Sequence, residues 1–178
     1  AVFFAEKVMP GLRTARPEAE FLVLGAHPNQ QVQDLAELEG VTVLGFVEDY
    51  KPYFWSATAF VSPLYLGAGM RVKVLEAMAC GAPVIATSLS MNGLGAKDGQ
   101  HYIRAESATN FIESAVQCIE SPAKVQQVGD QGRQLIVERH GYQRKAKERE
   151  SIWYSVIEDW QANHDTPKAP HPRFEIIK

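Results

Sequence analysis

Residues 61–87 read VSPLYLGAGMRVKVLEAMACGAPVIAT, and this stretch decides the fold. An apolar strand leads into a loop that contains Gly67 and Gly69. A helix opens near Arg71, stops at Gly81 and gives way to a second apolar strand. This order predicts a βαβ unit with a glycine-containing turn before its helix. Such a turn lets main-chain N–H groups approach an anion at the helix N-terminus.

The side chains that follow this turn suit a nucleoside diphosphate. Arg71 and Lys73 lie where a phosphate needs cations, and Glu76 lies one turn further along the helix. A carboxylate only accepts hydrogen bonds, so Glu76 can accept two from the vicinal diol of a ribose. Residues two apart on a helix point about 200° apart, so both cations reach one phosphate only if Arg71 lies in the loop. Alternatively, Lys73 pairs with Glu76, three residues on.

Composition narrows the class of protein. The chain has 178 residues, a formal net charge of −3, 46% apolar and 22% charged residues, as expected for one globular domain. The net charge of −3 is a weak argument against nucleic acid as the main partner. No apolar run approaches the roughly 20 residues of a membrane span, and Ala1 leads into an amphipathic helix rather than a signal peptide. Cys80 and Cys118 are expected to be reduced, as in a cytoplasmic protein.

Strands and helices alternate along the chain. Short apolar strands are expected at residues 21–25, 41–44, 59–62, 84–87 and 102–103. Helices are expected at residues 2–14, 31–38, 49–55 and 71–80, the third with Asp49 as its N-cap. Three further helices follow, one capped by Ser107, one opened by Pro122 and one over residues 142–160. The alternation predicts an α/β fold with a doubly wound, Rossmann-like parallel sheet.

These motifs resemble the C-terminal, donor-binding domain of a group-one (family four) retaining glycosyltransferase with the GT-B architecture. The family's hallmark helix reads Leu-Glu-Ala-Met-Ala-x-Gly-x-Pro-Val, as residues 75–84 do here. One subset of the family carries a Gly-x-Gly-x-Arg-x-Lys loop, which matches residues 67–73. The likeness extends over residues 1–160, which form the predicted donor-binding domain, and leaves residues 161–178 as an extended or disordered tail.

The resemblance assigns roles to matching positions. Arg71 and Lys73 are the expected catalytic residues, with Arg71 and helix N–H groups stabilising the charge that grows on the leaving diphosphate. Donor binding falls to the other matching positions, Phe46, Val47, Gly67, Gly69, Met70, Val72 and Glu76. Phe46 and Val47 are expected to receive the nucleobase, and Glu76 the ribose hydroxyls. Many family members have a second Glu eight positions before Glu76, where this chain has Ala68.

The implied reaction is transfer of a sugar from a nucleoside-diphosphate sugar to an acceptor sugar, lipid-linked glycan or small molecule, with retention of configuration. The resemblance places the domain's first strand and an N-terminal acceptor domain before Ala1, so the chain is expected to be an inactive half. The implied location is cytoplasmic, with the inner face of the membrane as an option. No cofactor or metal is expected, since the chain has no Asp-x-Asp and no Cys/His spacing typical of zinc.

Two alternatives remain open. One is a nucleotide-sugar epimerase of the same architecture, whose acidic catalytic residues would lie outside this chain. The other is a non-catalytic nucleotide-binding or scaffold module, a reading to which Ala68 points. A dinucleotide-dependent oxidoreductase is disfavoured, because no Gly-x-Gly-x-x-Gly follows the first strand.

Overall fold

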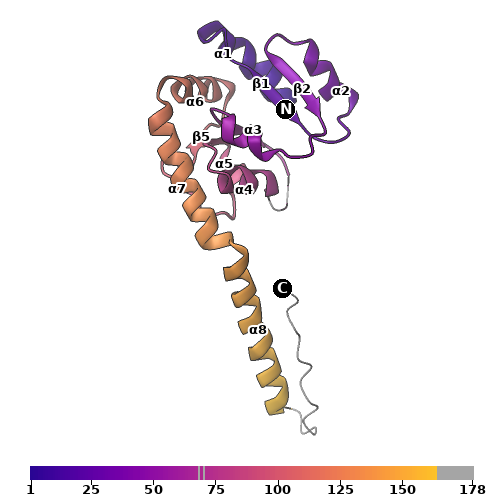
Figure 1. The fold of residues 1–178 in the computed structure, drawn as a ribbon, viewed down its shortest axis with the longest axis vertical. Coiled ribbons are helices and arrows are strands. Elements are labelled where there is room, and N and C mark those ends of the chain that lie inside the picture. The colour runs from indigo at the N-terminus through magenta and orange to yellow at the C-terminus, as the bar shows by residue number, and fades with distance from the viewer. Residues whose placement is uncertain (68, 70, 164–178) are drawn as a thin grey trace. The chain divides into compact units, whose positions relative to one another are not determined.

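The computed structural model describes residues 1–67, 69 and 71–163 (Figure 1). Ala68, Met70 and most of the predicted tail therefore lie outside the described residues. The chain divides into two compact units at residues 139 and 140, and each unit is described by itself.

The first unit alternates short strands with helices, which confirms the predicted α/β class. Its strands are β1 (Phe21–Leu24), β2 (Val41–Gly45), β3 (Phe60–Ser62), β4 (Val84–Ala86) and β5 (Ile103–Arg104). Its helices are η1 (Phe4–Val8), α1 (Met9–Ala15), α2 (Gln30–Gln33), η2 (Asp34–Glu37), α3 (Lys51–Ser56), α4 (Val72–Ala79), α5 (Ser88–Met91), α6 (Ala108–Glu120) and α7 (Pro122–His140). Of these, η1 is a π-helix and η2 is a 3₁₀ helix.

All strand pairs are parallel, and they form two sheets. β1 pairs with β2, and β3, β4 and β5 form the second sheet, in which Val61 lies opposite Ile85 and Ile85 opposite Ile103. Within the described residues no ladder joins β1 to β3. The predicted parallel pairing of the strands is confirmed. The single sheet that the sequence predicted is divided into two, with β1 in one sheet and β3 in the other.

One hydrophobic cluster joins the two sheets. It contains Val23 and Val43 from the first sheet, Val61 and Ile85 from the second, and Phe111 of α6. Residues of η1 and α1 also belong to it, and both elements contact α6. The two sheets therefore share one helical layer on one face.

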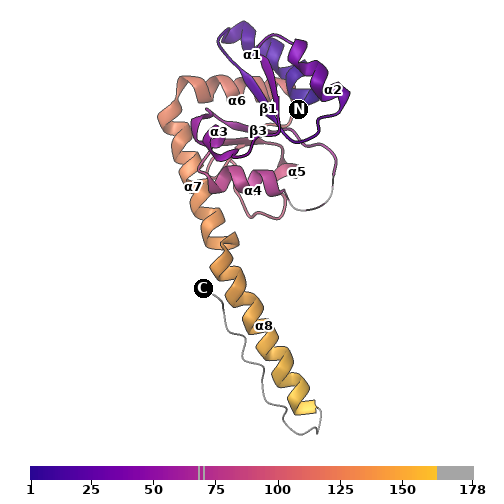
Figure 2. The same ribbon diagram turned by 45° about the vertical axis from the view of Figure 1, so that its right-hand side comes forward.

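A second hydrophobic cluster covers the opposite face of the β3–β5 sheet. Phe60 and Val84 belong to it, together with Met78 of α4, Met91 of α5 and Leu135 of α7. Alternate strand residues point to opposite faces, so Val61 and Ile85 serve one cluster while Phe60 and Val84 serve the other. This sheet is thus covered on both faces, with α6 above it and α4 below it in Figure 2.

The helix boundaries differ from the predicted ones for local reasons. The helix expected at residues 31–38 begins at Gln30, because the side chain of Asn29 accepts a hydrogen bond from the N–H of Val32. The helix expected from Asp49 begins at Lys51, with Tyr50 as its N-cap residue. The Asp49 carboxylate still accepts a hydrogen bond from the N–H of Lys51, at 3.0 Å.

The apolar spacing of the sequence predicts Val74, Leu75, Met78 and Ala79 as the core-facing side of α4, and the structure confirms this for Val74 and Met78. Val74, Ala77 and Met78 are buried, whereas Ala79, expected in the core, is exposed. Positions i, i+3 and i+4 lie on one helix face, so Ala77 and Met78 face the core together with Val74. Glu76 falls beside this face and stays partly open to solvent, as the sequence predicted.

The second unit contains α8 (Tyr142–Asn163), which runs past the predicted end at residue 160. The sequence predicts an apolar stripe on one side of this helix, and within this unit the side chains of the stripe are exposed: Trp153, Val156, Ile157 and Trp160. Among the helices of the described residues, none is both long and apolar enough to cross a membrane.

The two cysteines are both free and are expected to react at different rates. Burial raises the pKa of the Cys118 thiol to about 11, whereas Cys80 is only partly buried. Because the thiolate is the reactive form, iodoacetamide at pH 8 should alkylate Cys118 at least tenfold more slowly than Cys80 in the folded protein. Mass spectrometry of the native and guanidinium-unfolded protein measures this difference. Fast native labelling of Cys118 in a Cys80→Ser variant would place that thiol outside the core.

Candidate functional site

The loop between β3 and α4 adopts a backbone that favours glycine. Gly67 and Gly69 have φ angles of 136° and 103°, in the region that L side chains rarely adopt. Arg71 follows as the N-cap residue of α4, with φ −87° and ψ 63°. Arg71 therefore lies in the loop, which meets the condition for both cations to serve one anion.

The guanidinium of Arg71 is folded onto this loop. Nη1 donates to the carbonyl of Gly69 at 2.7 Å, and Nη2 donates to the carbonyl of Gly67 at 2.9 Å. Nε is buried and has no hydrogen-bond partner among the described residues. A buried donor left unpaired costs about 1–3 kcal/mol. An arginine has five N–H donors, so donors remain for an anion while both loop contacts stay in place.

The N-terminus of α4 carries no side-chain cap. Arg71 makes no capping bond, and the first main-chain bond of the helix runs from the N–H of Leu75 to the carbonyl of Arg71, at 3.0 Å. In the part of the chain that the structure describes, no bond occupies the N–H groups of Val72 and Lys73. Val72, the first residue of the helix, is 49% exposed, so this end lies at the surface of the part of the chain that the structure describes. The positive end of the helix dipole is thus open to an anion.

Lys73 is engaged with Glu76 rather than with the glycine loop. Its Nζ donates to Oε2 of Glu76 at 2.9 Å and lies 4.8 Å from the centre of the Tyr50 ring. A hydrogen bond to the Glu76 carboxylate raises the pKa of Tyr50 above its ordinary value, and burial adds to this shift. The structure thus has Lys73 paired with Glu76, which was the alternative given by the sequence. The role of Lys73 at the diphosphate stays a prediction.

The sequence did not single out Tyr50 as a site residue. The feature of the sequence that could have indicated Tyr50 is its position, directly before α3 and a few residues after the Phe46–Val47 segment. Phe46 itself is 75% exposed at the carboxyl end of β2, and Val47 is partly buried. The structure therefore brings Arg71 to Gly67 and Gly69, and Lys73 to Glu76. No interaction recorded for the described residues links Phe46 or Val47 to these groups.

Buried hydroxyls anchor the start of the glycine loop. The Thr87 hydroxyl donates to the carbonyl of Leu64 at 2.6 Å, and the Ser90 hydroxyl donates to the carbonyl of Ser62 at 2.7 Å. Thr87 also caps α5 by accepting from the N–H of Ser90. Both side chains are almost fully buried. The sequence analysis missed this network, whose one signal was a hydroxyl residue directly after β4.

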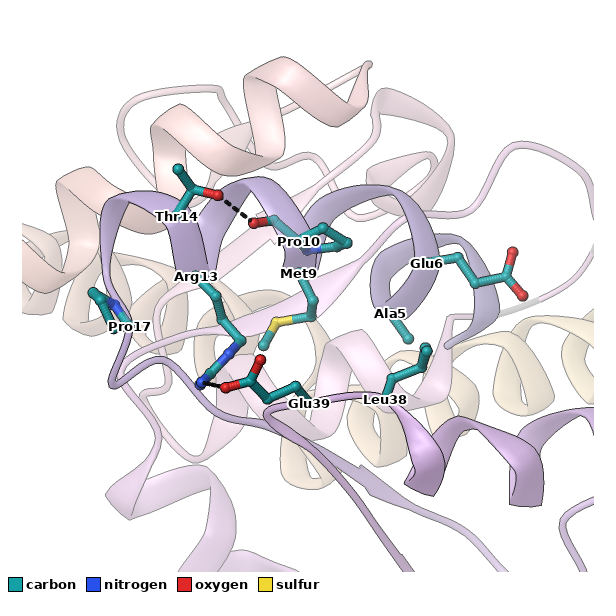
Figure 3. A pocket seen from close by; sticks show the side chains of 9 residues that line it. All are labelled: Ala5, Glu6, Met9, Pro10, Arg13, Thr14, Pro17, Leu38 and Glu39. Carbon is teal, nitrogen blue, oxygen red and sulfur yellow. Dashed lines mark hydrogen bonds and ion pairs between the residues drawn. The ribbon is translucent and has the colours of Figure 1, made fainter.

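A cavity of about 560 Å³ lies elsewhere in the first unit (Figure 3). Its lining residues come from η1, α1 and two nearby turns: Ala5, Glu6, Met9, Pro10, Arg13, Thr14, Pro17, Leu38 and Glu39. Arg13 already donates to Glu39 at 2.6 Å, so its charge is neutralised within the protein. None of the residues predicted to bind a donor lines this cavity. Among the described residues no cluster of His, Cys, Asp or Glu is arranged to hold a metal ion.

Comparison with known proteins gives one family and several solved structures. The family model described as "Glycosyl transferases group 1" matches residues 1–121. A phosphatidyl-myo-inositol mannosyltransferase from Propionibacterium freudenreichii subsp. shermanii is 32% identical over 83 residues, which are 46% of this chain and 20% of that protein.

Two solved structures share the fold. The HepE protein of Anabaena, determined in complex with UDP, aligns with a TM-score of 0.66 and 18% identity, over 82% of this chain and 44% of HepE. The C-terminal domain of LpcC, a group 1 family glycosyl transferase of Francisella tularensis, aligns with a TM-score of 0.64 and 18% identity, over 79% of each chain. The chain thus spans less than half the length of the mannosyltransferase and of HepE, but most of the isolated LpcC domain.

Proposed function

Because this chain belongs to the group 1 glycosyl transferase family and has the GT-B type of fold, we propose that its full-length protein transfers a sugar from a nucleoside-diphosphate sugar to an acceptor, with retention of configuration. The chain supplies the donor-binding half. The observation that carries this proposal is the open N-terminus of α4 beside the Arg71 guanidinium. The UDP in the HepE complex supports a nucleoside diphosphate as the leaving group.

In this reaction the bond between the anomeric carbon and the diphosphate oxygen breaks, and its electron pair stays on the diphosphate. The acceptor hydroxyl forms the new bond to the anomeric carbon and loses its proton. Arg71 and the N–H groups of Val72 and Lys73 face the charge that grows on the diphosphate, which is the group that needs stabilising. Glu76 accepts the ribose hydroxyls. The acceptor is a sugar, a lipid-linked glycan or a small molecule.

The proposal includes parts of the protein beyond this chain. A further strand lies between β1 and β3, and an acceptor domain faces the donor site across a cleft. Support for the strand comes from the sheets themselves: within the described residues β1 pairs only with β2 and β3 pairs only with β4, yet both strands contribute to one core cluster. Residues 1–160 then form most of the donor domain. The free cysteines are in keeping with a cytoplasmic location.

The proposal is tested by calorimetry of the full-length protein with UDP, GDP and ADP. Wild type is expected to bind one of them, and Glu76→Ala to bind it 10- to 100-fold more weakly, because hydrogen bonds to a charged group contribute about 1.5–3 kcal/mol. Glu113→Ala, at an exposed position of α6, is the matched control and should leave the affinity unchanged. Equal affinities of wild type and Glu76→Ala would remove the ribose role, and a wild type that binds no nucleoside diphosphate would overturn the function.

A further inference from the structure

Helix α8 carries side chains at the spacing of a coiled coil. It is one continuous helix of 22 residues, which makes it about 33 Å long at 1.5 Å per residue (Figure 1). Six positions recur along it at alternating intervals of four and three residues, and together they form what we call the α8 seam: Tyr142, Ala146, Arg149, Trp153, Val156 and Trp160. A repeat of this kind keeps its members on the side of a helix that faces a second helix.

The α8 seam is open to solvent within the second unit. Tyr142 is 87% exposed, Trp153 is 67% exposed and Val156 is 54% exposed. Aromatic side chains bury about 150–250 Å² each, and a specific interface between two proteins needs about 1,000 Å² in total. Two copies of the seam, each with three aromatic residues, therefore offer a large part of the area that a stable pair needs.

Charge is distributed unevenly along α8. Its basic residues all lie in the half formed by residues 142–151: Arg144, Lys145, Lys147 and Arg149. Its acidic residues lie in both halves: Glu148, Glu150, Glu158 and Asp159. The first half thus has an excess of two positive charges, and the half formed by residues 152–163 has two negative charges. A helix with this pattern attracts a copy of itself that runs in the opposite direction.

An antiparallel pair brings compatible side chains together along the α8 seam. In one register, Tyr142 lies opposite Trp160 of the second copy, so the seam overlaps over its full length. The same register places Arg149 opposite Trp153 of the second copy, where a guanidinium can stack on the face of an indole ring. A parallel pair would place Arg149 beside Arg149 of the other copy, and these two cations repel each other. The seam therefore favours the antiparallel orientation.

The same register pairs opposite charges beside the α8 seam. Lys145 comes opposite Asp159 of the second copy at each end of the pair, and Ile152 comes opposite its own counterpart at the centre. Lys145 already donates to Glu148 at 2.7 Å, but an ammonium has three donors and can serve both carboxylates. On the other flank Glu150 approaches Glu150 of the second copy, a like-charge contact that limits the affinity.

The charges of α8 fit a lipid surface less well. Helices that lie on anionic membranes concentrate Lys and Arg on their polar face, whereas α8 has equal numbers of basic and acidic residues. Glu158 and Asp159 lie in the same helical turn as Trp160, so insertion of that ring would bring two carboxylates to the headgroups. A second copy of the chain is the occupant that the charges favour.

We propose that the α8 seam pairs with the α8 seam of a second copy of this chain, in antiparallel orientation, with Arg149 against Trp153 and Lys145 facing Asp159. The full-length protein is then a dimer that is joined through α8. This pairing is independent of the proposed function, because it uses no residue of the candidate donor site.

The test reverses the charges beside the seam in the full-length protein. Sedimentation equilibrium is expected to show a dimer for wild type. Lys145→Asp and Asp159→Lys are each expected to raise its dissociation constant about 10- to 30-fold, because two attractive contacts become repulsive. In an equimolar mixture of the two variants each contact again joins opposite charges, so a dimer of wild-type affinity is expected. Circular dichroism of each variant shows that the helix is kept.

The matched control is Lys147→Asp. It makes the same change of charge in the same half of α8, at a position on the side of the helix away from the seam. The dissociation constant should stay within about twofold of the wild-type value, because an exposed charge without a facing partner contributes little.

Three results would overturn the proposal. A wild type that stays monomeric at the highest concentration has its seam covered in another way, and binding of that monomer to vesicles of phosphatidylcholine and phosphatidylglycerol would identify a lipid surface as the occupant. A dimer weakened equally by Lys145→Asp and Lys147→Asp responds to net charge rather than to the seam. A mixture of Lys145→Asp with Asp159→Lys that does not regain the wild-type affinity shows that the dimer is held by a different face.

Discussion

Replacing Gly129 by alanine is expected to lower the free energy of unfolding by about 2 kcal/mol. A Cβ at this position of α7 would lie 2.5 Å from the carbonyl oxygen of Gly81 and 3.1 Å from the nitrogen of Pro83. Both are main-chain atoms, so the helix itself has to move, and such overpacking costs about 3 kcal/mol. The better helix propensity of alanine returns about 1 kcal/mol of this. Thermal unfolding should show a midpoint about 6 °C lower.

A matched control separates the close approach from the general effect of glycine in a helix. In α1, a Cβ added to Gly11 would meet only the Cδ1 and Cγ1 atoms of the Ile112 side chain, which can rotate away. Gly11→Ala is therefore expected to leave the stability nearly unchanged. If both variants lose the same stability, helix–backbone contact is not the cause at Gly129.

The Gly129 substitution is also expected to disturb the candidate site, because α7 packs against the turn that ends α4. Gly81 lies in this turn with a φ of 78°, and the side chain of Gln126 donates to its carbonyl at 3.2 Å. Met78 of α4 lies in the same hydrophobic cluster as Leu135 of α7. A displaced α7 thus disturbs the C-terminal end of the helix whose N-terminus forms the anion site.

The second large effect is expected for Arg71→Met in the full-length protein. The substitution removes a guanidinium that clamps the carbonyls of Gly67 and Gly69 and lies at the open end of α4. The affinity for the nucleoside diphosphate should fall about 100-fold, while the affinity for the parent nucleoside should stay within twofold. The rate of donor hydrolysis by water should fall by about 10²- to 10³-fold, as on removal of a donor that faces developing negative charge.

Arg13→Met provides the control for this change. Arg13 also donates to a main-chain carbonyl, that of Ala19, at 3.0 Å, and it pairs with Glu39. Its loss should affect stability but neither nucleotide affinity nor hydrolysis. Arg71→Met binding the diphosphate as tightly as wild type does would show that the guanidinium only shapes the loop.

Local signals in the sequence predicted the elements that carry the site. The glycines before Arg71 and the apolar spacing around Val74 and Met78 predicted the loop and α4, because turn backbone and helix periodicity are set by near neighbours. Ser107 was likewise predicted as the cap of α6, and its side chain accepts from the N–H of Asn110. The family match predicted Glu76 as a site residue.

Features that depend on distant residues were not predictable in this way. Tyr50 meets Lys73 only because α3 and α4 lie on the same side of the β3–β5 sheet, and nothing in the local sequence encodes that meeting. The hydroxyl of Thr87 finds the carbonyl of Leu64, which is far from it along the chain. The division between β1 and β3 is also a matter of pairing between distant segments. The helical period of α4 did not decide whether Ala77 or Ala79 is buried, and packing against the rest of the fold buries Ala77.

The interrupted sheet has a practical consequence for handling residues 1–139. Unpaired strand edges are templates for other extended chains. In the described part of the chain, β1 and β3 each have one such edge, on either side of the interruption. When this fragment is produced without the rest of the protein, the free edges of different copies are expected to pair with one another, and the fragment is expected to precipitate. An added peptide of alternating apolar residues, supplied during refolding, would compete for the same position and keep the fragment in solution.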